Sequence, residues 1–168
     1  MKYLLVPFAA LLLISCNEKK STVFVETINW EKRSIALNPA DTFETGKTYL
    51  SVYPQIYSRN EDRTEDLTAT VSLRNVSTKD SVYLLKAGYF HTSGKPVRTY
   101  FEKPIYLAPL ETVEIILADN DNAGGSGANF IFDWKIKPHT PEPLFECVML
   151  STSGGQGISF TTKGVRTN

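Results

Sequence analysis

A serine between two glycines is the first candidate for nucleophilic chemistry in this chain, at Gly125-Ser126-Gly127. The nucleophile elbow of hydrolases needs a further glycine at position 128 and a helix after the serine, but residue 128 is alanine. The two histidines, His91 and His139, both stand beside turn residues. A triad needs a nucleophile, a base and an orienting acid together. The nucleophile elbow and the triad each lack a required part here, so we expect no catalytic residues and no enzyme.

Oxygen-bearing side chains alternate at Asp119 and Asp121, with Gly124 at the sixth position of the run. A calcium loop also needs an oxygen ligand at its fifth position and a bidentate glutamate at its twelfth. Those positions hold Ala123 and Phe130. The sequence favours an ordinary acidic turn and leaves a weak, irregular cation site as the alternative. With two histidines and one free thiol in no paired spacing, we expect no metal centre and no cofactor.

Gly46-Lys47-Thr48 resembles the end of a phosphate-binding loop. That loop needs a glycine five positions earlier, where this chain has Asp41, and a helix whose N-terminal amides face the phosphate. The following residues, 49–57, have the composition of a strand. We therefore expect no nucleotide site here.

One of the two cysteines, Cys16, ends the run Leu13-Ile14-Ser15-Cys16, which resembles the lipobox of bacterial lipoproteins. The preceding residues have a basic start at Lys2 and an apolar core over 4–14, the parts of a secretory signal. That core is too short to span a bilayer, which takes roughly 20 residues. We predict a signal peptide over 1–15, cleavage before Cys16 and acylation of its sulfur. The alternative is a plain secreted protein.

Acyl chains on Cys16 would make the membrane a partner of the protein, because each buried methylene contributes about 0.8 kcal/mol. Asn17 follows the cysteine. An aspartate there would resemble the inner-membrane retention signal, so the outer membrane is the better expectation in a cell with two membranes. Once Cys16 is acylated, Cys147 has no partner for a disulfide, and we expect it to be a buried, inert thiol on a central strand.

Charge gives no indication of a polyanionic partner. The chain has 18 lysines and arginines against 18 aspartates and glutamates. Nucleic-acid binding domains have an excess of basic residues on one face. We therefore expect no nucleic acid as a partner.

Short segments of alternating or β-branched character follow one another from residue 48, separated by clusters of glycine, proline, asparagine and aspartate. Leu67, Ala69, Val71 and Leu73 alternate with polar residues and show the period of two most clearly. We predict strands over 49–57, 67–74, 81–90, 97–101, 112–118, 129–136, 144–151 and 157–162. This pattern predicts an all-β fold, an antiparallel immunoglobulin-like β-sandwich of about seven or eight strands.

The domain boundaries follow from the same pattern. Residues 16–46 are expected to be the lipid anchor and tether, with a short turn of helix at 31–33, and residues 47–168 the β-sandwich domain. Pro54 would remove a ladder hydrogen bond, so the strand over 49–57 should lie at an edge or carry a bulge.

Two glycine-rich loops, 119–129 and 153–157, are the remaining candidates for binding. Three glycines in each loop indicate that backbone approaches something closely, either a ligand or another part of the chain. Asn129 is expected to pin the first loop through its amide. The candidate binding residues are Asp119, Asp121, Ser126, Asn129 and Gln156.

The chain resembles the domain-of-unknown-function family 3124, which occurs in exported bacterial proteins. The resemblance covers about 52–166 and depends on Tyr53-Pro54-Gln55-Ile56-Tyr57, Leu67 to Asn75, Gly124 to Phe130 and Gly157-Ile158-Ser159-Phe160. It implies an all-β exported domain and supplies no catalytic residue, ligand or partner.

These observations predict a membrane-anchored, non-catalytic envelope lipoprotein that binds another envelope protein or has a structural role. The alternative is a module that binds a small ligand, a sugar or a metal ion, at the two glycine-rich loops. Tyrosines are abundant, and they could form a sugar platform or simply pack on the sheets; packing is the favoured interpretation.

Overall fold

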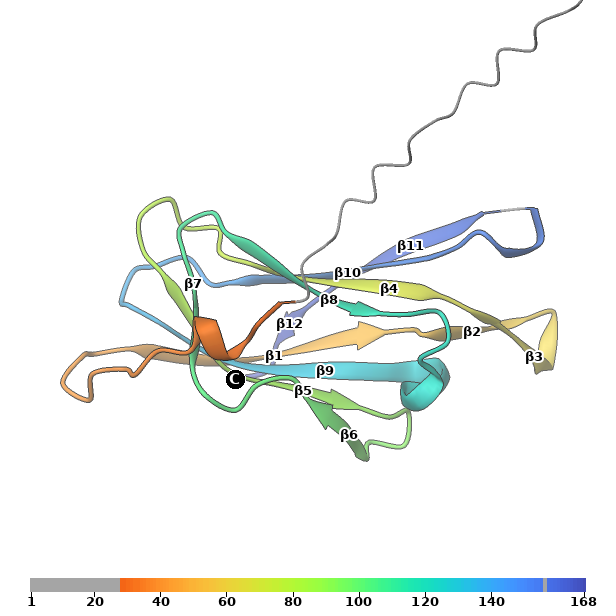
Figure 1. Cartoon of the computed structure of the whole chain (residues 1–168), viewed down its shortest axis with the longest axis horizontal. Coiled ribbons are helices and arrows are strands. Elements are labelled where there is room, and N and C mark those ends of the chain that lie inside the picture. Colours follow the sequence, from red (N-terminus) through yellow and green to blue (C-terminus); the bar gives the residue numbers. More distant parts are fainter. Residues whose placement is uncertain (1–27, 156) are drawn as a thin grey trace, which may run out of the picture.

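The computed structural model describes residues 28–155 and 157–168. The predicted signal peptide, Cys16 and Gln156 therefore lie outside the described residues. Two antiparallel sheets pack face to face in a sandwich (Figure 1). The predicted all-β antiparallel sandwich is confirmed, whereas the immunoglobulin-like arrangement stays a prediction.

The larger sheet has the order β12-β1-β9-β5-β6, with β7 also paired to β5. Its strands are β1 (Glu44–Val52), β5 (Val82–Phe90), β6 (Pro96–Thr99), β7 (Ile105–Leu107), β9 (Ala128–Ile136) and β12 (Val165–Arg166). The smaller sheet has the order β11-β10-β4-β8. Its strands are β4 (Thr68–Arg74), β8 (Thr112–Leu117), β10 (Leu144–Ser151) and β11 (Ile158–Lys163).

A separate hairpin of β2 (Gln55–Ser58) and β3 (Asn60–Asp66) projects from one end of the sandwich (Figure 1). Three short 3-10 turns complete the described elements: η1 (Glu31–Arg33), η2 (Asn122–Gly127) and η3 (Ser153–Gly155). No helix within the described ranges is both long and apolar enough to cross a membrane.

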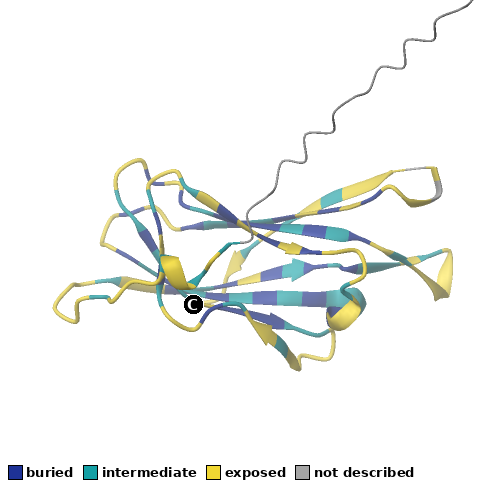
Figure 2. Ribbon diagram, in the orientation of Figure 1, coloured by how far each residue is buried: buried dark blue, intermediate teal, exposed yellow. Residues whose placement is uncertain are grey.

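The core lies between the two sheets, where every second residue of the central strands is buried (Figure 2). Strand β9 alternates strictly along its whole length, which follows from the period of two of its apolar residues. The ring of Phe132 stacks on Phe145 of the opposite sheet, with centroids 4.3 Å apart. Trp134 is buried, and its indole N–H donates to Thr48 Oγ1 at 2.9 Å, which satisfies its polar atom.

One side of the sandwich is closed by the chain itself. Strand β11 ends the smaller sheet, and the chain passes through Gly164 into β12 of the larger sheet. Gly164 N–H donates to the carbonyl of Phe145 at 2.8 Å, and Thr162 Oγ1 donates to the carbonyl of Ser51 at 2.6 Å. A Cβ at Gly164 would lie 2.7 Å from Thr48 Cγ2, so only glycine fits this crossing without displacement.

The strands predicted from residue 67 onward coincide with β4, β5, β6, β8, β9, β10 and β11 to within two residues at each end. The described chain has twelve strands rather than seven or eight. The additional ones are short, such as β7 and β12, or lack apolar alternation, such as β3. Strand β3 is exposed along nearly all of its length, so burial does not impose a pattern on it.

Pro54 does not lie in a strand, and the expectation of one strand over 49–57, at an edge or with a bulge, is wrong. Strand β1 ends at Val52 and β2 begins at Gln55. Strand β1 is also internal, between β12 and β9. Because Pro54 stands past the end of β1, it removes no ladder hydrogen bond, and its carbonyl accepts the Leu67 N–H at 2.8 Å.

The folded part of the chain starts before residue 47. Strand β1 begins at Glu44, and Ile28 and Trp30 pack against the core. Residues 31–33 form the expected turn of helix. We call the described segment before β1, residues 28–43, the lead-in; a bridge between Ser34 and Ile105 docks it on the sandwich.

Candidate functional site

The first glycine-rich loop forms η2, between β8 and β9, at the same end of the sandwich as the β2–β3 hairpin (Figure 1). Gly125 has φ +70° and ψ −165°, a conformation that side chains avoid. Gly124 is buried, and a Cβ there would lie 1.9 Å from the hydroxyl oxygen of Tyr89. The close approach predicted for this loop is therefore an approach to the chain's own core.

Thr92, in the β5–β6 turn, pins this loop. Its N–H donates to the carbonyl of Gly124 at 2.9 Å, and its hydroxyl donates to the same carbonyl at 3.1 Å. The hydroxyl also accepts the N–H of Gly127 at 2.8 Å. These bonds satisfy backbone groups at both sides of the glycine bend.

Asn129 does not have the predicted pinning role. It lies in β9, opposite Ser51 on one side and Phe90 on the other. Among the hydrogen bonds of the described residues, none involves its side chain. Asn129 is already inside the strand ladder, which satisfies its backbone without help from the amide. A threonine in a turn gives no sequence signal for which distant loop it contacts, so Thr92 could not be found from sequence alone.

Asp121 is held by an arginine. Arg98 Nη1 lies 2.8 Å from Asp121 Oδ2, and Nη2 lies 3.2 Å from Oδ1, a bidentate pair. This bond to Asp121 is the main cause that raises the pKa of Arg98 above its ordinary value. Arg98 also donates to the Tyr100 hydroxyl at 3.2 Å. A cation at Asp121 would have to displace the guanidinium.

Asp119 is exposed and lies before η2, while Ser126 is half-buried within it. Within residues 28–155 and 157–168, no group of three or more histidine, cysteine, aspartate or glutamate side chains is placed to hold a metal ion. The structure thus brings Asp121, Ser126 and Asn129 to one end of the sandwich without assembling a ligand set.

Tyr89, one of the tyrosines expected to pack on the sheets, lies beneath η2. It is fully buried, and its hydroxyl has no hydrogen-bond partner among the described residues. Burial is the main cause that raises the pKa of Tyr89, and the nearby charge of Asp121 raises it further. The hydroxyl is covered by Gly124, so it is not presented to a ligand.

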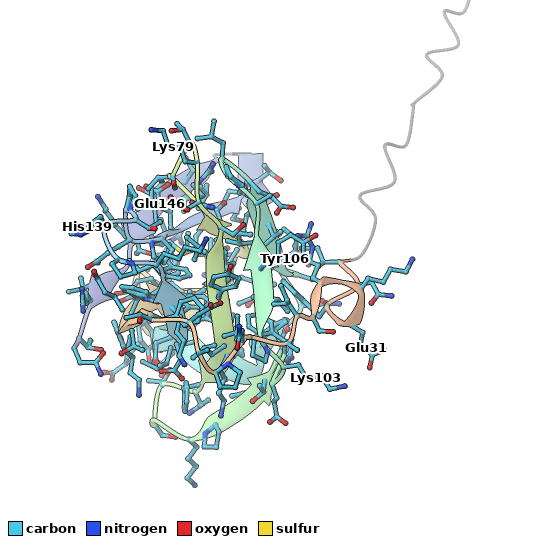
Figure 3. All side chains as sticks on the ribbon, turned by 90° about the vertical axis from the view of Figure 1, so that its left-hand side faces the viewer. Glu31, Lys79, Lys103, Tyr106, His139 and Glu146 are labelled. Atoms are coloured by element: carbon cyan, nitrogen blue, oxygen red, sulfur yellow. The ribbon has the colours of Figure 1, made fainter. Side chains whose placement is uncertain are left out.

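His91 lies beside η2, because a Cβ at Gly125 would be 3.0 Å from its Nε2, but among the described residues no hydrogen bond joins either histidine ring to Ser126 or to a carboxylate. His91 Nδ1 accepts the N–H of Ser93 at 3.0 Å and lies 2.9 Å from the Ser93 hydroxyl, so this nitrogen contacts no carboxylate. His139 follows the far end of β9, a strand of nine residues (Figure 3). At about 3.3 Å per residue, β9 separates it from Ser126 by roughly 30 Å.

The second glycine-rich loop contains η3, at the tip of the β10–β11 hairpin. Gly155 has φ +77°, and a Cβ there would meet nothing within 4 Å. A glycine is required at position 155 by the backbone conformation, not by a close contact. The candidate Gln156 lies outside the described residues.

Cys147 lies on β10, between β4 and β11, and is fully buried. Its predicted position on a central strand and its burial are confirmed. Burial raises the pKa of its thiol to about 12. Its sulfur lies 3.3 Å from Met149 Sδ. The outer face of the same strand is apolar too, but it is exposed.

That outer face of the smaller sheet has an apolar row. Ile116 on β8 and Val148 on β10 both oppose Thr70 of β4, and Leu150 opposes Thr68 one step further along. The exposed fractions of Ile116, Val148 and Leu150 are 50%, 40% and 41%. We call Ile116, Val148 and Leu150 the apolar row.

Polar residues border the apolar row on one side. Arg74 Nε lies 3.4 Å from Glu146 Oε2, and Ser72 Oγ donates to Glu114 Oε1 at 3.2 Å. Lys163 is paired in register with Glu146. Positive and negative groups balance on this part of the face, so it has no net charge.

The family described as "Protein of unknown function (DUF3124)" matches residues 45–167, and the chain belongs to this family. The resemblance predicted from the sequence is thus confirmed. No curated protein is similar enough in sequence to count as a relative. A solved structure, that of Thermotoga maritima 1070, is similar over 71% of this chain and 92% of that chain, with 10% sequence identity and a TM-score of 0.44. A likeness at this level says nothing about function.

Proposed function

We propose that this protein is a non-catalytic module of the bacterial envelope, tethered by lipid on Cys16, which binds another envelope protein through the apolar row. The supporting observation is three exposed aliphatic side chains on one sheet face: Val148 and Leu150 are neighbours on β10, and Ile116 lies across Thr70 of β4 from Val148. Exposed apolar side chains that share one surface are typical of interaction sites, whereas isolated ones are ordinary.

The chemistry of the face describes the partner. Aliphatic side chains flanked by threonines bury apolar area without demanding a charged group opposite. The neighbouring ion pair between Arg74 and Glu146 neutralises itself, so long-range steering is weak. The partner is a protein surface with apolar side chains and little net charge.

Photo-crosslinking at Ile116 tests this proposal in intact cells. Ile116 is half exposed, so a photoreactive side chain there reaches a bound partner. We expect one discrete adduct, and we expect it to disappear when Val148→Lys places a charge in the apolar row. The matched control is Val165→Lys on β12 of the other sheet, where Val165 is 64% exposed. No adduct, or an adduct that is equally strong in Val148→Lys, contradicts the proposal. An adduct of twice the chain's mass would show that the partner is a second copy of this chain, and would contradict the proposal of another envelope protein.

Anchoring is tested separately with Cys16→Ser. The variant should be blocked in maturation and should leave the membrane fraction, because the acyl chains bind through their sulfur linkage. Metabolic labelling with a palmitate analogue measures acylation directly. Label retained on the serine variant would contradict lipidation at Cys16, and fractionation of the wild type distinguishes the outer from the inner membrane.

The alternative, a small ligand at loops 119–129 and 153–157, has no supporting observation in the first loop. Thr92, Tyr89 and Arg98 account for its close backbone contacts and for the Asp121 carboxylate. The backbone groups at the glycine bend and the Asp121 carboxylate already bond to other parts of the chain, so this loop needs no ligand to be stable.

A further inference from the structure

A groove of about 360 Å³ lies between the lead-in turn η1 and the connection from β6 to β7. The residues that line it are Trp30, Glu31, Ser34, Thr99, Tyr100, Phe101, Glu102 and Lys103. Small-ligand sites usually enclose about 300–1,000 Å³ and combine aromatic walls with a few polar groups. The groove has this size and this composition.

The aromatic wall is fixed by the core. Phe101 is 7% exposed, and the Trp30 ring lies against it with centroids 5.1 Å apart and planes tilted by 40°. Tyr100 packs on Phe130, with centroids 5.6 Å apart. Trp30 is only partly buried, so part of its ring faces the groove. A partly exposed aromatic ring that lines a groove can serve as a platform for a flat apolar surface.

The turn that presents Trp30 is docked at three points. Ser34 pairs with Ile105, and the N–H of Ile35 donates to the carbonyl of Pro104 at 2.8 Å. Arg33 Nη2 lies 2.7 Å from Glu111 Oε1. The groove is therefore formed before any ligand arrives, which reduces the entropy lost on binding.

Charged side chains stand at the rim of the groove. Glu31, the first residue of η1, and Lys103 lie on the same side of the molecule (Figure 3), and Glu102 precedes Lys103 in the chain. None of the three takes part in an ion pair among the described residues, so they are available to a ligand. Carboxylates accept hydrogen bonds, the ammonium donates them, and the rim has one more negative than positive group.

We propose that this groove binds a sugar ring of a neutral glycan. The C–H face of a pyranose is a flat apolar surface that packs on Trp30, and its hydroxyls donate to both Glu31 and Glu102 and accept from Lys103. The excess of carboxylates disfavours acidic sugars. The groove is separate from the apolar row, and neither proposal depends on the other.

The two tryptophans of the chain make binding measurable by fluorescence. Trp134 is 1% exposed, so a ligand in the groove leaves its emission unchanged. The emission of Trp30, which lines the groove, should change when a ligand binds. The full-length protein in detergent is titrated with cellotetraose, maltotetraose, chitotetraose and an oligogalacturonate of equal length. We expect a saturable change with at least one of the three neutral oligosaccharides and a weaker one, or none, with the acidic oligomer.

Variants then locate the site. Saturation-transfer NMR, which needs no tryptophan signal, should show an affinity loss of at least about tenfold in Trp30→Ala and in Glu102→Gln. Glu102 is exposed, so Glu102→Gln keeps the test valid if Trp30→Ala fails to fold. Tyr106→Ala, at an exposed tyrosine outside the groove, is the matched control and should bind as the wild type does. No saturable binding of any neutral probe, stronger binding of the oligogalacturonate, or unchanged affinity in Glu102→Gln would overturn the proposal.

Discussion

At the scale of single residues, the glycines of η2 divide into those that the fold requires and those that it tolerates. Gly124 lies against Tyr89 and Ala128, and a Cβ there would come within 1.9 Å and 2.6 Å of their atoms. At Gly127 the nearest atom to such a Cβ would be 3.5 Å away, an ordinary contact. Identical glycines in the sequence therefore have different structural roles.

Gly124→Ala should lower the free energy of unfolding by about 1–3 kcal/mol, because the added methyl group overpacks a closed site. Gly127→Ala is the matched control and should change it by less than about 0.5 kcal/mol. Urea unfolding of both variants measures the difference. Equal stability of the two variants would show that the loop moves away from Tyr89 at little cost.

Cys147 should react slowly with a thiol reagent in native buffer and rapidly in urea, because it is fully buried on an internal strand. Its pKa is raised from 9.0 to about 12 by burial, so the folded state favours the neutral thiol. The contribution of this thiol to the free energy of unfolding is fully present below pH 9 and is lost as the pH rises from about 9 towards 12.

Cys147→Ala should therefore show a shallower loss of stability above pH 9 than the wild type. Tyr89 also titrates in the alkaline range, and Cys147 is the smallest of the causes that act on its pKa, so the contribution of Tyr89 differs only slightly between the wild type and the alanine variant. Urea unfolding at several alkaline pH values measures the two slopes. Parallel slopes, or fast native labelling of the wild type, would contradict the assignment of an inert thiol.

At the scale of elements, the turn between β5 and β6 holds η2 in place through Thr92. Thr92→Val keeps the shape of the side chain but removes both hydroxyl bonds. We expect a loss of about 0.5–1.5 kcal/mol in the free energy of unfolding, because the hydroxyl's bonds to Gly124 and Gly127 are lost while water can reach the exposed N–H of Gly127. Asn129→Ala should cost less, because no side-chain bond of Asn129 holds the loop among the described residues. Thermal unfolding compares the two variants, and a larger loss in Asn129→Ala would restore the role predicted from sequence.

The elements predicted well from the sequence are those whose burial imposes a pattern. Strands β4, β9 and β10 alternate because one face lies in the core, and their limits were predicted closely. Strand β3 is exposed and polar, so it gives no such signal. The contacts of Thr92 and Tyr89 with η2 join segments more than thirty residues apart, and local patterns do not encode such pairings.

At the scale of the whole molecule, the lead-in joins the sandwich to the part of the chain that carries the proposed lipid anchor. Glu111, between β7 and β8, holds it: its Oε1 bonds to Arg33 at 2.7 Å, and its Oε2 accepts the N–H of Ala108 at 2.7 Å. Burial alone would raise the pKa of Glu111, but the bonds from Arg33 and Ala108 outweigh burial and lower its pKa below 4.5. Because the pKa of Glu111 is lower in the folded state, its carboxylate contributes to stability above about pH 4.5. This contribution is lost as the pH falls through the folded pKa.

Acidification should therefore release the lead-in before it unfolds the core. Amide hydrogen exchange at Arg33, Ser34 and Ile35 should accelerate as the pH falls below about 4.5, beyond the intrinsic pH dependence of exchange, while β9 stays protected. Glu111→Gln keeps an acceptor for Ala108 but removes the charge opposite Arg33. Its lead-in should exchange faster than the wild type's at neutral pH, and the two proteins should converge in acid. Wild-type and variant lead-ins that differ by a constant factor across this range would show that another group holds the lead-in on the sandwich.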